Sequence, residues 1–127
     1  AARLLQKTVQ WVQSNRVEAA TELSKKYDAV CVLKGTGSVV SGHSYCGINV
    51  SGNPGMATAG MGDVLTGVIA ANVGNRDAAA DKLSANVKNA VFLHGLAGDY
   101  TAKFGEIGII ASDVIACLPK AIDFCSN

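Results

Sequence analysis

Little charge, and almost no surplus of one sign, characterises this sequence of 127 residues. Charged residues make up 17% of the chain, and 11 Lys and Arg against 10 Asp and Glu leave a net charge of +1. Without a basic surplus, the chain has no electrostatic attraction for nucleic acid or for an anionic membrane surface. Aromatic residues account for only 6% and are scattered, which excludes a base-stacking platform. We therefore expect neither a nucleic-acid partner nor a membrane partner.

The usual signs of metal binding, disulfide bonding and export are also absent. There are two histidines, and the four cysteines show no CxxC spacing, so the sequence predicts no metal site and no disulfide scaffold. No apolar run is long enough to span a membrane, and the first residues lack a signal-peptide pattern. Reduced thiols and the lack of an export signal indicate a cytoplasmic protein.

Hydrophobic residues make up 49% of the chain and predict a globular α/β fold. Helices are expected at 8–27, 63–73, 79–104 and 112–124, the last strained by Pro119. Strands are expected at 29–33, 38–41 and 45–50, the last two as a hairpin, and a turn is expected at 74–77. The apolar strand at 29–33 is typical of a parallel sheet buried on both faces, yet the chain holds no parallel neighbour for it. Since the chain also begins without Met, in residues whose pattern is typical of a helix, we expect part of a larger α/β domain.

The most informative segment is a glycine-rich loop at residues 52–62, which leads directly into apolar, helix-forming residues. Its four glycines and one proline exclude a helix or strand interior. Where such a loop enters a helix, several backbone N–H groups lack partners and point the same way, and the helix dipole reinforces them. This arrangement attracts anions, phosphate above all.

Asp63 lies at the junction of this loop and the predicted helix. An acidic residue in a first helical turn often does no more than complement the dipole. Here Gly60-Met61-Gly62 precedes it and allows the backbone amides to close on a ligand. The pattern favours a catalytic carboxylate that removes a proton from an attacking hydroxyl beside a bound phosphate.

Two common phosphate-binding motifs do not match this loop. A P-loop requires a lysine where Met61 stands. The dinucleotide fingerprint requires a third glycine after Gly35-Thr36-Gly37, and it requires a strand directly before a glycine pair such as Gly60 and Gly62. The sequence therefore disfavours both of these nucleotide-binding folds.

Two further features have both a structural and a functional interpretation. Residues 34–38 follow the buried strand and form either a tight turn or a nucleotide-lining turn, with Lys34 as the charge and with Thr36 and Ser38 as hydroxyl donors. His94, on the predicted helix at 79–104, is more often a packed, hydrogen-bonded histidine than a catalytic one.

Residues 53–71, NPGMATAGMGDVLTGVIAA, resemble the signature of the ADP/ATP-dependent NAD(P)H-hydrate dehydratases, which belong to the ribokinase-like superfamily. Segments at 32–39, 93–99 and 108–115 resemble the same family in the same order. The resemblance implies a three-layer ribokinase-like α/β fold, with residues 1–127 as a single partial domain, the C-terminal part. Two departures stand out. Thr36 and Ser38 occupy positions where the family commonly has Ala and Thr, and the family's N-terminal half, with much of the hydrate pocket, is missing.

The family resemblance also implies a reaction. Hydrated NADH or NADPH carries a ring hydroxyl that leaves poorly as hydroxide. Phosphorylation of that hydroxyl by ADP or ATP, usually with Mg²⁺, gives a phosphate that the lone pair of the ring nitrogen can expel.

By the same resemblance, individual residues acquire roles. Asp63 would be the base and would contact the hydrate. The phosphoryl group would be stabilised by the amides of Ala59, Gly60, Met61 and Gly62. Nucleotide contacts would come from Lys34, Gly35, Thr36, Gly37, Ser38, Asn53, Gly55 and Gly62. The expected partners are NAD(P)H hydrate and an adenine nucleotide, together with either a second copy of the chain or a complementing N-terminal segment.

Two alternatives remain open at this point. A Gly-x-Gly-Asp junction is shared across the superfamily, so a kinase acting on another small molecule has the same core motif. A non-catalytic nucleotide-binding fragment is the other alternative, because half a sheet exposes an edge that pairs with something.

Overall fold

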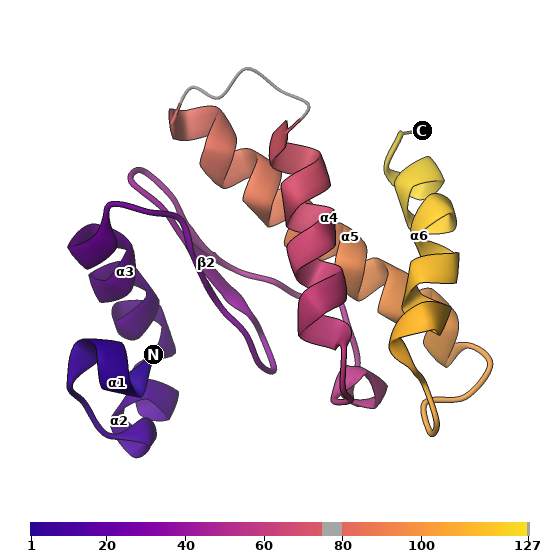
Figure 1. Cartoon of the computed structure of the whole chain (residues 1–127), viewed down its shortest axis with the longest axis horizontal. Helices are drawn as coiled ribbons and strands as arrows, with labels where there is room; N and C mark the ends of the chain where they lie inside the picture. Colours follow the sequence, from indigo (N-terminus) through magenta and orange to yellow (C-terminus); the bar gives the residue numbers. More distant parts are fainter. Residues whose placement is uncertain (75–79, 127) are drawn as a thin grey trace.

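A three-stranded sheet lies between two groups of helices in the computed structural model, which describes residues 1–74 and 80–126 (Figure 1). The strands are β1 (Cys31–Leu33), β2 (Val39–Ser41) and β3 (Cys46–Ile48), in the order β1-β2-β3. Both pairs are antiparallel, with Val40 opposite Val32 on one side and Gly47 on the other. The predicted hairpin is confirmed, and all three strands are shorter than the sequence suggested.

β1 differs from the strand that the sequence predicted. Helices cover both of its faces, but all three of its residues are only partly buried, so the complete burial expected from the sequence is wrong. The reason is that β1 is an edge strand, with β2 as its single neighbour within the described part of the chain. Its other edge carries backbone groups without a strand partner there.

The helices before the sheet are α1 (Ala2–Leu5), α2 (Val9–Ser14) and α3 (Arg16–Tyr27). The single helix expected at 8–27 is broken at Asn15, whose φ of −129° and ψ of 46° are not helical. Both its backbone N–H and its side-chain amide donate to the carbonyl of Trp11, each at 2.9 Å. This side-chain bond competes with helical continuation, so α3 starts anew at Arg16.

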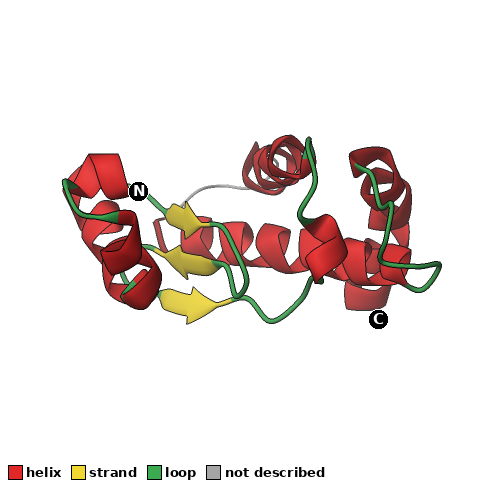
Figure 2. Ribbon diagram, turned by 90° about the horizontal axis from the view of Figure 1, so that it is seen from below, coloured by secondary structure: helices red, strands yellow, loops and turns green. Residues whose placement is uncertain are grey.

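The two faces of the sheet pack against different helices. Cys31 and Leu33 join a cluster around the buried residues Leu5, Val12, Ala19 and Leu23. Val32 alternates with them and points into a second cluster, built by Val40, Leu65, Val87 and Val91. Because side chains alternate along a strand, α3 covers one face while helices from the second half of the chain cover the other (Figure 2). The three layers expected of the fold are therefore present.

After the sheet come η1 (Pro54–Met56), α4 (Met61–Gly74), α5 (Ala80–Ala102) and α6 (Ala111–Ser126). α5 contacts both α4 and α6, and a third cluster joins them around Met61, Ala97, Ile109, Val114 and Ala121. α6 continues through Pro119. The turn expected at 74–77 falls largely on residues outside the described part, and α4 extends to Gly74.

Across residues 1–74 and 80–126, no helix is long and apolar enough to span a membrane.

Candidate active site

The glycine-rich loop ends where α4 begins, at the lower end of that helix in Figure 1. Gly60 has a φ of +83°, a left-handed conformation that favours glycine, and its carbonyl accepts the N–H groups of Asp63 and Val64 at 3.0 Å each. The preceding N–H groups of Met61 and Gly62 belong to the first turn, where a helix offers no carbonyl to receive them. Together with Ala59, the four amides predicted to hold a phosphoryl group thus lie in one short segment at the helix start.

The ammonium group of Lys34 lies against this helix start. A Cβ added to Gly62 would collide with Lys34 Nζ, so glycine is what permits the approach. A cation beside the positive end of a helix dipole is unfavourable by itself. The pair becomes favourable when an anion lies between the ammonium and the free amides. The structure therefore brings together two predicted groups, the Lys34 turn and the α4 amides, that lie more than twenty residues apart in the chain.

The turn that carries Lys34 is held from the α3 side by Arg16. The Arg16 Nη2 group donates to the carbonyl oxygens of Leu33, Lys34 and Gly37 at 3.0, 3.3 and 3.4 Å. Within the turn, Ser38 Oγ donates to the Gly35 carbonyl at 3.1 Å. A charged residue between the apolar positions of the helix expected at 8–27 would lie on its outer face, yet Arg16 is half-buried and bonded to the turn.

The start of the glycine-rich loop is fixed by Asp99 on α5. Its carboxylate accepts the Gly52 N–H at 2.9 Å and the Asn53 side-chain amide at 3.0 Å. Asn53 Oδ1 in turn accepts the Gly55 N–H at 3.1 Å. The structure thus gives Asn53 a role in shaping the loop, and its predicted contact with a nucleotide stays a prediction, as does that of Gly55. Sequence reasoning missed Asp99, although it closes the segment 93–99 that carries part of the family resemblance.

Glycine occupies two positions of α5 at which the backbone and side chains of residues 51–56 lie close to the helix. A Cβ on Gly95 would meet Ser51, and a Cβ on Gly98 would meet Met56. Ser51 Oγ also donates to the Phe92 carbonyl at 2.8 Å. These glycines therefore allow the loop to pack directly on the helix.

His94 lies beneath the site and is 7% exposed. Burial lowers the pKa of its imidazole from 6.5, a hydrogen bond with the backbone of Met61 opposes this, and the nearby Lys34 charge lowers the pKa further. The ring is therefore neutral at physiological pH. Nε2 is buried and has no hydrogen-bond partner within the described residues. The packed histidine expected from the sequence is what the structure contains.

Asp63 is exposed in the first turn of α4, and no described side chain pairs with its carboxylate. The carboxylate is therefore accessible to a ligand that approaches the start of α4. Thr36 is exposed too, while Gly37 and Ser38 are half-buried, so the turn is open to an approaching ligand at its middle.

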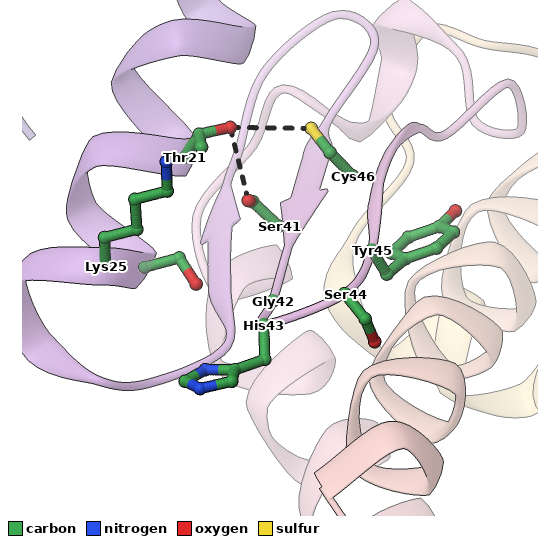
Figure 3. A pocket seen from close by; sticks show the side chains of 9 residues that line it. Thr21, Lys25, Ser41, Gly42, His43, Ser44, Tyr45 and Cys46 are labelled. Atoms are coloured by element: carbon green, nitrogen blue, oxygen red, sulfur yellow. Dashed lines mark hydrogen bonds between the residues drawn. The ribbon is translucent and has the colours of Figure 1, made fainter.

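A cavity of about 570 Å³ lies elsewhere, between α3 and the turn that joins β2 to β3 (Figure 3). Ser41 donates to the Thr21 hydroxyl at 3.4 Å, and Thr21 donates to Cys46 Sγ at 3.8 Å. His43, at its rim, is 3.5 Å from the exposed Asp28 carboxylate. β2 runs away from the Lys34 turn toward this cavity, so the two features lie at opposite ends of the sheet.

A family model described as NAD(P)H-hydrate dehydratase matches residues 1–120. The chain is 46% identical over 129 residues to the bifunctional NAD(P)H-hydrate repair enzyme Nnr of Thermofilum pendens, covering 95% of this chain and 23% of that protein. It is 40% identical over 125 residues to the enzyme of the same name from Escherichia coli K12, covering 97% and 24%.

Among solved structures, the chain is similar to an ADP/ATP-dependent NAD(P)H-hydrate dehydratase from Bacillus subtilis, co-crystallised with ATP and Mg²⁺ and soaked with CoA. The TM-score is 0.87 at 28% identity, covering 96% of this chain and 44% of the other. The chain thus spans about a quarter of the length of the curated relatives it matches. The ribokinase-like α/β fold class expected from the sequence is confirmed by this likeness. Since the family model matches nearly the whole sequence, the chain belongs to the NAD(P)H-hydrate dehydratase family.

Proposed function

We propose that the protein carrying this chain converts NAD(P)H hydrate to NAD(P)H, with ADP or ATP as the phosphoryl donor. The observation that carries the proposal is the position of Lys34 Nζ against Gly62, at the start of α4. An ammonium group and a helix N-terminus that face the same space form a site for the phosphates of a nucleotide. The relatives named NAD(P)H-hydrate repair enzymes support the choice of substrate.

In the proposed reaction, the ring hydroxyl of the hydrate attacks the terminal phosphorus of the nucleotide. Asp63 takes the hydroxyl proton, and the bond from phosphorus to the bridging oxygen breaks, which releases ADP from ATP or AMP from ADP. The lone pair of the ring nitrogen then expels inorganic phosphate, and loss of a proton from the adjacent ring carbon restores the double bond. The Asp63 carboxylate is exposed and has no side-chain partner among the described residues, which supports its role in the first of these proton transfers.

The backbone amides and Lys34 serve the phosphoryl group itself. Negative charge builds up on the equatorial oxygens of the phosphoryl group during transfer. We propose that this charge is stabilised by the backbone amides of Ala59, Gly60, Met61 and Gly62. Lys34, with Gly35, Thr36, Gly37 and Ser38, would contact the remaining phosphates. Because the loop is fixed by Asp99 and the turn by Arg16, these groups are oriented before the nucleotide arrives.

Magnesium fits this site as an ion that arrives on the nucleotide. No group of three or more His, Cys, Asp or Glu side chains able to hold a metal occurs within residues 1–74 and 80–126. Mg²⁺ is commonly held by one or two carboxylates together with substrate phosphates, and Asp63 is the carboxylate in the first turn of α4. When bound, the ion neutralises part of the phosphate charge.

The open edge of β1 supports the expectation of a further chain segment or copy beside it. We propose that in the intact protein an N-terminal segment or a second copy pairs with this edge. Co-expression of residues 1–127 with the preceding part of the intact protein, followed by size-exclusion chromatography, tests this. Separate elution of the two pieces would contradict pairing with the N-terminal segment.

The activity is tested on the intact protein with NADH hydrate, Mg²⁺ and either ADP or ATP, by the recovery of NADH absorbance. Asp63→Asn removes the base, and we expect turnover to fall by about 10²–10⁴-fold, the usual contribution of a general base. Asp28→Asn is the matched control, because Asp28 is exposed at the end of α3 and its left-handed conformation suits Asn.

Three other outcomes would refute parts of the proposal. Full turnover in Asp63→Asn would exclude this carboxylate as the base. Phosphorylation of another small molecule without NADH recovery would favour a kinase of the same superfamily. ATP binding by calorimetry without any turnover would favour a nucleotide-binding role alone.

A further inference from the structure

Arg16 occupies an unfavourable position for a cation. It is the first residue of α3, where the helix dipole presents its positive end. A cation there needs compensation from elsewhere. The compensation is visible in the structure, because Arg16 Nη2 donates to the carbonyl of Leu33 at the end of β1 and to the Lys34 and Gly37 carbonyls of the following turn.

The guanidinium also fills the space behind the turn. A Cβ on Gly35 would lie 3.0 Å from Arg16 Nη1 and 3.1 Å from Nη2, and the φ of Gly35 is +140°. Arg16 Nη1 donates to Gln13 Oε1 at 3.2 Å, which steadies the side chain from α2. Arg16 and the turn therefore form one packed unit, with glycine required at the point of contact.

This contact fixes the direction of the peptide groups in the turn. In a trans peptide, the N–H of one residue points opposite to the C=O of the residue before it. Since the Lys34 and Gly37 carbonyls point toward Arg16, the N–H groups of Gly35 and Ser38 point away from it. The N–H groups of Gly35 and Ser38 therefore point away from α3, and the Lys34 side chain extends to the start of α4.

We propose that Arg16 is a positioning residue for nucleotide binding: it orients the turn at 34–38 so that its amides and Lys34 face the phosphates, without touching the nucleotide itself. This rests on the proposed function, in that the turn is taken to line the nucleotide site. Nη2 reaches the carbonyls of the turn while Nη1 reaches Gln13 on α2, so the role requires two donor groups held rigidly apart, which the planar guanidinium of arginine provides and the single ammonium of lysine does not.

The test measures ATP–Mg²⁺ binding to the intact protein by calorimetry, alongside the turnover assay. Arg16→Gln should raise the Kd for ATP by about tenfold, the equivalent of about 1.4 kcal/mol. The KM for the hydrate should stay within twofold of wild type, because among the described residues no hydrogen bond of Arg16 reaches the glycine-rich loop at 52–62. Arg16→Lys should restore only part of the affinity. Arg3→Gln is the matched control, since Arg3 is exposed on α1 and has no described side-chain contact with the turn.

The folding of each variant is checked by circular dichroism and a melting curve. If Arg16→Gln does not fold, the Kd of Arg16→Lys for ATP tests the proposal. An unchanged Kd for ATP, an equal rise in the KM of both substrates, or full restoration by Arg16→Lys would each overturn the proposal. Calorimetry does not require hydrate turnover, so a protein that binds ATP but leaves the hydrate intact would refute the proposed reaction while still testing Arg16.

Discussion

Replacement of Gly62 by alanine, at the start of α4, is expected to change the stability of the fold and the proposed activity in opposite directions. The added Cβ would occupy the place of Lys34 Nζ, so the ammonium has to move away from the helix end. The end of a lysine side chain is flexible, and its displacement costs the fold little. Gly62 also lies within a helix, where alanine is favoured over glycine.

The substitution is expected to raise the stability of the fold and to lower kcat/KM for the nucleotide, and the size of each effect can be calculated. Alanine in place of a helical glycine stabilises by up to about 1 kcal/mol, less in a first turn, which raises Tm by a few degrees in a domain of this length. Under the proposed function, displacing Lys34 removes its proposed charged hydrogen bond to a phosphate of the nucleotide, which would be worth about 1.5–3 kcal/mol. That loss corresponds to about a 10- to 100-fold fall in kcat/KM for the nucleotide.

Gly67→Ala is the matched control for this variant. Gly67 lies on the same helix, and a Cβ there would meet nothing within 4 Å among the described residues. We expect Gly67→Ala to raise Tm and leave kcat/KM unchanged, while Gly62→Ala leaves Tm equal or higher and lowers kcat/KM. Wild-type kcat/KM in Gly62→Ala would refute the reasoning that places Lys34 at the phosphates.

Two further predictions concern groups behind the site. Asp99→Ala leaves the Gly52 N–H and the Asn53 amide without their acceptor, so we expect the free energy of unfolding to fall by about 1–3 kcal/mol, measured by urea denaturation. An unchanged urea midpoint would show that the carboxylate does not hold the loop. His94 has a pKa lowered by burial, so the unfolded state binds more protons below pH 6.5 and stability should fall as the pH drops through that value. His94→Gln should flatten this dependence between pH 7.5 and 5.5, and an unaltered slope would contradict the assignment.

The parts of the site that were predictable are contiguous in the sequence. The loop at 52–62 and Asp63 follow from local rules, because glycine spacing and a helix start act over a few residues. The hairpin at β2 and β3 follows from the same kind of local pattern. Their contact with a nucleotide remains a prediction, since the structure defines only the surfaces that would make it.

The supporting residues could not be found in this way, because their partners are distant in the chain. Arg16 bonds to carbonyls 17 to 21 residues away, and Asp99 bonds to amides 46 and 47 residues away. The periodicity around Arg16 concealed its role, since a polar residue between apolar ones looks like a solvated surface. The break at Asn15 depends on a side-chain bond to Trp11 that no propensity scale captures. The edge position of β1 likewise depends on which strands are present.

The packing of the loop on Gly95 and Gly98 has a consequence for how the protein can change over evolutionary time. Most packed positions tolerate some trimming, because a smaller residue leaves a gap that neighbours partly refill. Glycine is already the smallest residue, so every substitution at these two positions adds atoms against Ser51 or Met56. Substitutions at these two positions of α5 can therefore only enlarge the side chain. A single methyl group added at either position would displace a loop that lies more than thirty residues earlier in the chain. The displacement would also shift any ligand that this loop binds.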